Sequence, residues 1–383
     1  MGAEGLRGIG VIIDDDINDP TAKIHRLAAE LDQAGIPCVK YTEHPEEAAL
    51  ENIASAAFII LDWKIQKLDG VTIDVDNDVF VIPNAELIRE IKKRCFCPIF
   101  IFTNEEGIGL ISDALVKQDV IEDKPSDMVL IRRKRDLLDG QLFDEVASWV
   151  KANPAVYTLM EWSRNYEDAK QQLFSDFYAV SPTWPKVLWE AYAQDGVSAS
   201  DELGAMISRN LESRMIPFEF DPTAFEGDFP VTKDELRQVL AGEKFISNIP
   251  ESSLRAGDVF KLRGGKHYIN VRPDCDCINR DGETLELYLL RAKKVGNSDE
   301  VRLYSPRGNF DERSDECVIF NMVDSKTFSV KFKHLKVVSW EDVKDYRIGR
   351  LLPPHSTRLI QRYAQYQQRP GLPRIPKEAV QDE

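Results

Sequence analysis

Ala-Ala-Phe-Ile-Ile-Leu-Asp at residues 56–62 is the stretch of sequence that decides the fold of the N-terminal part. An apolar run of this length without polar alternation predicts a strand covered on both faces, as in parallel sheets. Four similar runs lie at residues 8–13, 37–41, 98–102 and 128–131. Helical periodicity marks residues 21–34, 46–55, 84–94 and 142–150. This strand–helix alternation predicts an α/β fold with a doubly wound, five-stranded parallel sheet.

Polar residues follow several of these runs, at the edge of the sheet where ligands bind in such folds. They are Asp14, Asp15 and Asp16 after the first run, Asp62 after the third and Thr103 after the fourth. Carboxylates from neighbouring strand ends form an oxygen-rich site suited to Mg2+, and a bound cation would relieve their mutual repulsion. A hydroxyl and an ammonium group beside them would meet the oxygens of a transferring phosphoryl group.

These residues resemble the receiver (CheY-like) domain of response regulators, in which an aspartate accepts a phosphoryl group from a histidine kinase. The motif is Leu-Asp-Trp-Lys-Ile-Gln-Lys-Leu-Asp-Gly at residues 61–70, with Gln66 where the family carries proline. The resemblance implies Asp62 as the phosphoacceptor and Thr103 as the hydroxyl that contacts the phosphoryl oxygen. It implies a Mg2+ site made by Asp14 (through water), Asp15, Asp62 and the backbone carbonyl of Lys64.

The lysine of the receiver site has two candidates. Lys124-Pro125 matches the family's dipeptide and lies 21 residues after Thr103, but the polar residues 118–123 before it make a poor central strand. Residues 128–131 make a better strand, and Lys134 follows it. We therefore favour Lys134 and keep Lys124 as the alternative.

The segment between Asp62 and Thr103 is longer than receivers generally need. Residues 71–81, where aspartates alternate with other residues, predict a solvated hairpin inserted after the third strand. A calcium loop is disfavoured because no glycine or closing glutamate stands at the required spacing.

Charge divides the chain near residue 150. Residues 1–150 hold 29 acidic and 16 basic residues, whereas the remainder holds 36 and 33, and the Asn153-Pro154 step follows this change. We expect a receiver domain at 1–152, a mostly helical linker or dimerisation region at 153–244, a small all-β barrel or sandwich at 245–340, and a basic C-terminal helix and tail at 341–383. The large aromatic residues of the helical region predict a packed core or a homodimer contact.

Two motifs of the second half are candidate binding sites. Cys275 and Cys277, with His267 and Cys317, could supply zinc ligands, but the pair is too closely spaced and no second pair exists. We expect the two cysteines to share one buried face of a strand.

The other motif is a set of arginines between residues 346 and 376, a segment without acidic residues. They are Arg347, Arg350, Arg358, Arg362, Arg369 and Arg374. Such a segment could touch nucleic acid or dock on an acidic receiver. Because the chain of 383 residues has a net charge of -16, we favour protein docking.

The sequence as a whole predicts a cytoplasmic signalling protein. No run approaches eighteen apolar residues, the N-terminus shows no secretory pattern, and six cysteines are too few for a disulfide scaffold. The narrower resemblance is to receiver proteins of Detocs-type antiphage two-component systems, which implies a histidine kinase, a second receiver-bearing effector and a phosphate-sink role. The alternatives are a regulator whose C-terminal half binds DNA, or an effector switched by the receiver.

Overall fold

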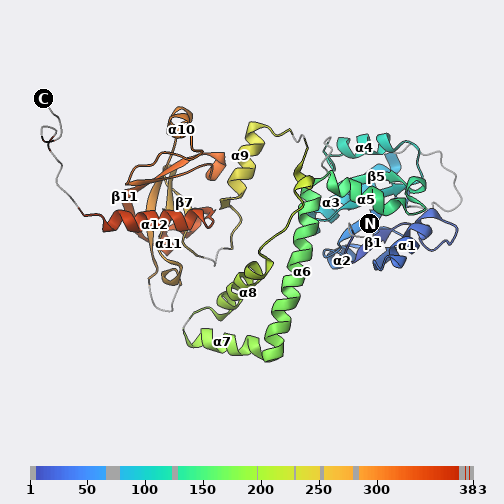
Figure 1. Cartoon of the computed structure of the whole chain (residues 1–383), viewed down its shortest axis with the longest axis horizontal. Coiled ribbons are helices and arrows are strands. Elements are labelled where there is room, and N and C mark those ends of the chain that lie inside the picture. The colour runs from blue at the N-terminus through green and yellow to red at the C-terminus, as the bar shows by residue number, and fades with distance from the viewer. Residues whose placement is uncertain are drawn as a thin grey trace. The chain divides into compact units, whose positions relative to one another are not determined.

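The computed structural model describes residues 6–65, 78–122, 128–195, 197–227, 230–250, 254–278, 284–370, 376 and 379. The chain divides into two compact units (Figure 1). The first consists of residues 1–187 with 203–227, and the second of residues 188–202 with 228–383.

The first unit contains a five-stranded parallel sheet in the order β2-β1-β3-β4-β5. The strands are β1 (Gly10–Ile13), β2 (Cys38–Tyr41), β3 (Phe58–Leu61), β4 (Ile99–Thr103) and β5 (Val129–Arg133). Every residue of β1, β3 and β4 is buried, as the unbroken apolar runs predict for strands covered on both faces. The prediction of a five-stranded parallel α/β sheet is confirmed.

Helices cover both faces of this sheet. They are α1 (Lys23–Gln33), α2 (Glu47–Asn52), α3 (Asp78–Arg94), α4 (Ile108–Lys117) and α5 (Gln141–Lys151). The apolar residues of α1 and α5 share one core cluster with Phe58 and Phe100, whereas α2, α3 and α4 contribute to the other with Ile59 and Ile101. The alternation of successive strand residues between the two clusters follows from the pleat of the strands.

One helix begins earlier than the sequence pattern indicated. The sequence predicts a hairpin at residues 71–81. Residues 71–77 of this range lie outside the described residues, and from Asp78 on the chain forms the helix α3 instead of a hairpin. Val81, Ala85 and Ile88 are buried at helical spacing, so packing against the sheet outweighs the alternating pattern that precedes them. The helix α4 has no counterpart among the helices expected from the sequence, and Ile111 and Leu115 form its buried face.

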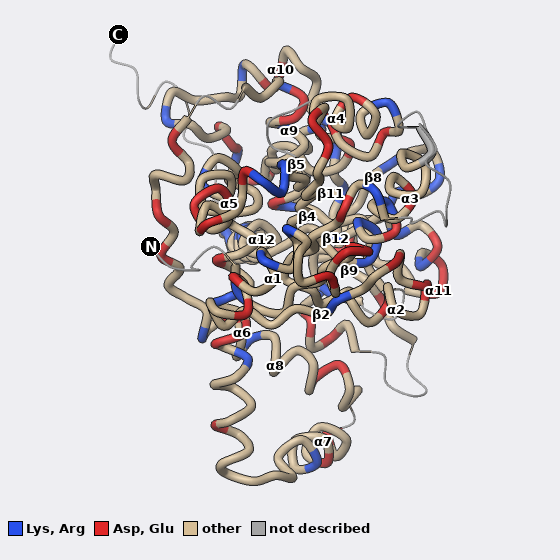
Figure 2. The backbone as a smooth tube through the Cα atoms, turned by 90° about the vertical axis from the view of Figure 1, so that its right-hand side faces the viewer, with Lys and Arg blue, Asp and Glu red and all other residues tan. Residues whose placement is uncertain are grey.

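A helical region follows the parallel sheet. Its helices are α6 (Pro154–Val180), α7 (Trp184–Gln194) and α8 (Ala199–Met215). Trp184 packs on Phe177 with ring centroids 4.7 Å apart, so part of the aromatic set forms a local core. Trp162 and Tyr178 remain 44% and 65% exposed, and charged residues are sparse along α7 (Figure 2).

The second unit is built on a curled, seven-stranded antiparallel sheet in the order β10-β11-β9-β8-β7-β12-β6. The strands are β6 (Phe245–Ile246), β7 (Asp258–Leu262), β8 (Lys266–Asn270), β9 (Glu286–Lys294), β10 (Glu316–Ile319), β11 (Phe328–Ser339) and β12 (Arg347–Leu351). The helices of this unit are α9 (Lys233–Gly242), α10 (Asn297–Leu303), α11 (Trp340–Val343) and α12 (His355–Gln368). The expectation of a β-rich unit with a C-terminal helix is confirmed in its coarser form, as a curled antiparallel sheet that also carries helices.

The segment expected as a basic tail is part of this second unit. Its strand β12 lies between β6 and β7, and α12 packs Leu359 and Tyr363 into the core of the sheet. Arg347 and Arg350 of β12 both pair with Asp258, which is fully buried, at 3.1 and 2.5 Å. These arginines are held inside the unit because a buried carboxylate needs cationic partners.

Cys275 lies in a short 3-10 helix at residues 274–276 and Cys277 directly follows it, so the pair is not on a strand. Cys275 is exposed whereas Cys277 is buried, so the two do not share a buried face. The Cys277 sulfur contacts the Asn270 amide at 3.4 Å, and burial raises the pKa of this thiol to about 11. Neither cysteine belongs to a cluster of metal-ligating side chains among the residues that the structure describes.

Over the same described ranges, no helix combines the length and the apolar character that crossing a membrane requires.

Candidate functional site

The carboxyl ends of the parallel strands bring four of the expected side chains to one edge of the sheet. Parallel pairing places Ile13 beside Leu61 and Leu61 beside Ile101. The residues that follow these three positions therefore lie at the same edge of the sheet. The backbone amide of Asp62 donates to the carbonyl of Ile13 at 2.9 Å, which extends the ladder to the candidate site. Asp14 and Asp62 are therefore neighbours because of strand register.

Lys134 is the residue that ties these strand ends together. It directly follows β5, and its side chain is only 1% exposed. Its Nζ lies 2.6 Å from Asp14 Oδ2 and 3.0 Å from Asp62 Oδ1. A buried ammonium between two buried carboxylates is favourable only with such close geometry, because all three groups have lost water.

Burial and neighbouring charges set the protonation of this site. Burial raises the pKa of Asp62 from 3.8 to about 7; the charge of Lys134 opposes the rise, and the charges of Asp14 and Asp15 add to it. Although burial disfavours its charged form, the pKa of Lys134 is raised because the Asp62 and Asp14 carboxylates stabilise the ammonium. Asp62 therefore exchanges its proton near neutral pH, and a cation bound beside it would favour the carboxylate.

The three consecutive aspartates form the only cluster of potential metal ligands found in the described part of the chain. Ligand atoms of Asp14, Asp15 and Asp16 lie within 4.8 Å of one another. The Asp14 carboxylate is fully buried and also accepts a hydrogen bond from the backbone amide of Asp16 at 2.9 Å. Asp62 stands outside this cluster and is connected to it through Lys134. The donor set suits a hard divalent cation such as Mg2+.

The loops after β3 and β4 meet beside these groups. Thr103, the last residue of β4, is 1% exposed, and its hydroxyl accepts a hydrogen bond from the Glu105 amide at 3.1 Å. The Lys64 ammonium pairs with the Glu105 carboxylate at 2.8 Å, which links the loop after Asp62 to the loop after Thr103. The loops after β3 and β4 are thus held together by a direct ion pair.

A small cavity opens next to the site. It has a volume of about 240 Å³ and is lined in part by Asp16, Asn104 and Lys134. The Lys23 ammonium, at the start of α1, donates to the side-chain carbonyl of Asn104 at 3.1 Å across this cavity wall. Asp62 itself is 6% exposed, so only a small part of this residue is open to solvent.

A contact that the sequence analysis missed supports the backbone after Asp62. Asn84 of α3, which is 1% exposed, donates from Nδ2 to the carbonyl of Trp63 at 2.7 Å. Its Oδ1 lies 3.1 Å from Nε2 of His44. A polar residue among the apolar residues of a buried helix face was the available signal. Lys124 and the motif residues 66–70 lie outside the described residues.

No protein-family model matches this chain, and a search of curated proteins finds no match. The fold and the site therefore define the class of protein only by their own geometry: a parallel α/β unit with an acidic site at the carboxyl ends of its strands.

Proposed function

We propose that the first unit is a receiver that accepts a phosphoryl group on Asp62 from the phosphohistidine of a kinase, with Mg2+ as cofactor. The observation that carries this proposal is the position of the Lys134 ammonium against both Asp14 and Asp62. A structural ion pair needs one carboxylate, whereas a phosphoryl-transfer site needs an acceptor, a cation for the phosphoryl oxygens and acidic metal ligands.

In the proposed reaction an Asp62 carboxylate oxygen attacks the phosphorus of a phosphohistidine. The new O–P bond forms as the P–N bond breaks, and the electron pair of that bond remains on the imidazole of the kinase. Lys134 and the hydroxyl of Thr103 stabilise the negative charge on the transferring oxygens. Asp14, Asp15 and the backbone carbonyl of Lys64 would hold Mg2+, which supplies further charge neutralisation.

The raised pKa of Asp62 links the protonation of the acceptor to metal binding. With its pKa raised to about 7, the acceptor is partly protonated at neutral pH without metal, and a protonated carboxyl is a poor nucleophile. A cation at the aspartate cluster favours the carboxylate, so metal binding and nucleophile activation are coupled. Phosphorylation of Asp62 would then add charge next to Thr103, Lys64 and Glu105, which is the change that a partner could read.

The wider context is part of the same proposal. We infer a cytoplasmic relay in which this chain takes phosphate from a histidine kinase and acts as a sink for it beside a second receiver-bearing effector. The exposed aromatic residues of α6 and α7, among them Trp162 and Trp189, support a homodimer contact, because exposed aromatic groups are enriched at interfaces.

The experiment uses the full chain with Mg2+ and a small phosphodonor such as acetyl phosphate, and measures the mass of the intact protein. We expect wild type to gain one phosphoryl group and Asp62→Ala to gain none, while Asp144→Asn, which alters an exposed aspartate of α5, gains one as wild type does. Equal incorporation into Asp62→Ala and wild type would contradict the proposal.

The DNA-binding alternative has little support, because four of the six tail arginines are engaged within the second unit. Arg347 and Arg350 pair with Asp258, and Arg358 and Arg362 pair with Glu312. A mobility-shift assay across salt concentrations tests it, since phosphate contacts would give a steep salt dependence. The switched-effector alternative is favoured by one observation, a polar cavity in the second unit.

A further inference from the structure

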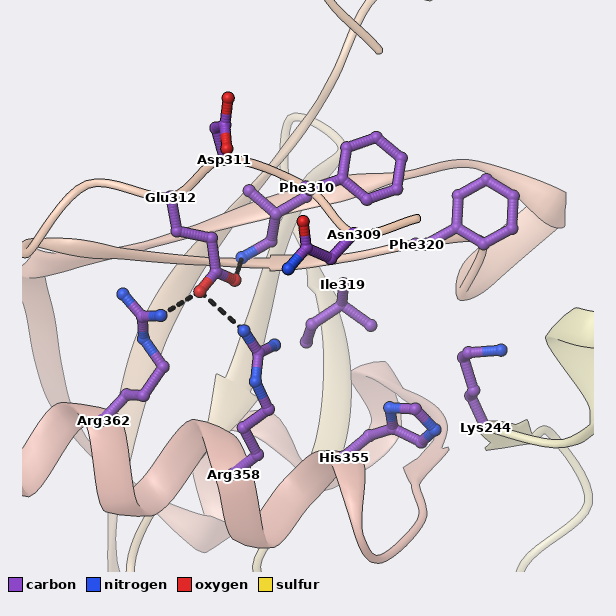
Figure 3. A pocket seen from close by; sticks show the side chains of 11 residues that line it. Lys244, Asn309, Phe310, Asp311, Glu312, Ile319, Phe320, His355, Arg358 and Arg362 are labelled. Atoms are coloured by element: carbon purple, nitrogen blue, oxygen red, sulfur yellow. Dashed lines mark hydrogen bonds and ion pairs between the residues drawn. The ribbon is translucent and has the colours of Figure 1, made fainter. Parts of the chain in front are cut away.

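The second unit contains a cavity of about 530 Å³ between the strand β10, residues 309–312 and the helix α12 (Figure 3). This volume lies within the range of pockets that bind small molecules. Three basic side chains of the lining come from successive turns of α12, and Lys244 directly precedes β6. They are His355, Arg358 and Arg362, together with Lys244.

The Glu312 carboxylate of this cavity is already neutralised by the protein. Glu312, whose side chain is 5% exposed, pairs with Arg358 at 2.6 Å and with Arg362, and its other oxygen accepts a hydrogen bond from the Val318 amide at 2.6 Å. Asp311, the other acidic residue of the lining, points away from α12 in Figure 3. The Glu312 carboxylate, which faces the cavity, thus has protein partners on both of its oxygens, while the Arg358 side chain is still 49% exposed.

The other two basic residues of the lining contribute one further cation, Lys244, and one imidazole, His355. Lys244 donates to the carbonyl of Leu240 at 2.8 Å and pairs with Glu243, a residue outside the lining, at 2.7 Å. The pKa of His355 is lowered, first because the imidazole is partly buried and then because of the Lys244 charge. The Glu243 carboxylate, 4.0 Å from its Nε2, opposes the shift, and the Arg358 charge adds to it. The cavity therefore offers cations and hydrogen-bond donors that an anion would satisfy.

One wall of the cavity is aromatic. Phe310 and Phe320 stack with ring centroids 5.6 Å apart and planes at 22°. The guanidinium of Arg237 lies 5.0 Å from the centroid of the Phe320 ring and fixes its position. Both phenylalanines are half-buried and contribute to the lining, so their exposed parts give a planar ring an apolar surface to pack against.

We propose that this cavity binds an organic phosphate that carries a planar ring, of the nucleoside monophosphate class. The phosphate contacts His355 and Arg358, and the ring packs beside Phe310 and Phe320. The proposal concerns binding alone, since the lining contains no nucleophile with an adjacent base. It does not depend on phosphorylation of Asp62, which belongs to the first unit.

Isothermal titration of the full chain with separate probes tests the proposal. The probes are AMP, CMP, adenosine, ribose 5-phosphate and inorganic phosphate. We expect AMP or CMP to bind and both adenosine and ribose 5-phosphate to bind at least about tenfold more weakly, because each lacks one of the two contacts. Equal binding of ribose 5-phosphate and AMP would contradict the ring contact, and no binding of any probe would overturn the proposal.

Matched variants locate the binding. We expect His355→Gln and Phe310→Leu to weaken nucleotide binding about tenfold or more, whereas His334→Gln, which alters an exposed histidine of β11, leaves it unchanged. The neutral Gln keeps the helix position filled, and thermal unfolding checks that each variant is folded. Equal loss in His355→Gln and His334→Gln would place the binding elsewhere and refute the assignment.

A second readout separates direct contact from a structural effect. Because an anion beside His355 offsets the Lys244 and Arg358 charges, the pKa of His355 should rise when nucleotide binds, as followed by NMR of the imidazole signal that is missing in His355→Gln. An unchanged His355 signal on saturation with nucleotide would contradict the contact. Retention of binding in Asp62→Ala shows that this inference stands or falls separately from the receiver proposal.

Discussion

Replacement of Asp62 by its neutral isostere, Asp62→Asn, tests the electrostatics of the site through the pH dependence of stability. The carboxyl has a pKa of about 7 in the folded chain, against 3.8 ordinarily, because it is buried beside Asp14 and Asp15. A raised carboxyl pKa contributes stability that is fully present below the unfolded value and is lost as pH rises through the folded value. The whole change is about 4 kcal/mol.

Most of that loss falls in an accessible pH range. Between pH 5 and pH 8, without divalent cations, the unfolding free energy of wild type should fall relative to that of Asp62→Asn by about 3 kcal/mol. The difference between the two proteins isolates Asp62, because every other titrating group is shared. Lys134 also pairs with Asp14, at 2.6 Å, and this partner is unaltered by the substitution, which limits secondary effects.

The assay is hydrogen exchange of the full chain across a urea series, read by mass spectrometry on peptides from β1 and β3. This readout reports opening of the parallel sheet by itself, so separate unfolding of the second unit does not enter. Asp144→Asn serves as the matched control and should track wild type at every pH. A difference between wild type and Asp62→Asn that stays flat, or that grows in favour of wild type as pH rises, would refute the reasoning.

Three further predictions concern the same two units. Lys134→Met leaves Asp14 and Asp62 buried without their cation. It should lower the unfolding free energy of the sheet by about 3–5 kcal/mol at pH 8 and by less at pH 5, as read by the same exchange experiment. Equal losses at both pH values would contradict the pairing of Lys134 with the two carboxylates. Mg2+ at a hundred times its dissociation constant should stabilise wild type by about 2.7 kcal/mol, and Asp15→Asn should weaken that effect. Calorimetric scans with and without Mg2+ measure the stabilisation, and its absence in wild type would count against a metal site. Asp258→Ala leaves Arg347 and Arg350 without their buried partner and should cost the second unit about 3–5 kcal/mol in urea unfolding, so a loss below 1 kcal/mol would show that the pair is dispensable.

The parallel sheet could be predicted from sequence because its signals are local. Each strand is a short apolar run, and the rule that parallel strands end at one edge brings Asp14 and Asp62 together without knowledge of the packing. The preference for Lys134 over Lys124 rested on the same kind of signal, the apolar run before it. Its contacts with both aspartates depend only on strand order and register.

Other features were not visible because they depend on residues far apart in the chain. The arginines of β12 appeared as solvent-exposed charges, since their partner Asp258 lies 89 to 92 residues earlier. The start of α3 was missed because its first turn follows an alternating stretch that is typical of strands. The cavity of the second unit joins Lys244 to α12, more than a hundred residues later, so no local pattern could indicate it.

The most direct test of the receiver proposal is to map the modified residue. The full chain is treated with acetyl phosphate and Mg2+, then with borohydride, which reduces an acyl phosphate of aspartate to homoserine, and the peptides are sequenced by mass spectrometry. The proposal predicts conversion at Asp62, with none at Asp14, Asp15 or Asp144. Conversion at another aspartate, or none anywhere, would contradict it.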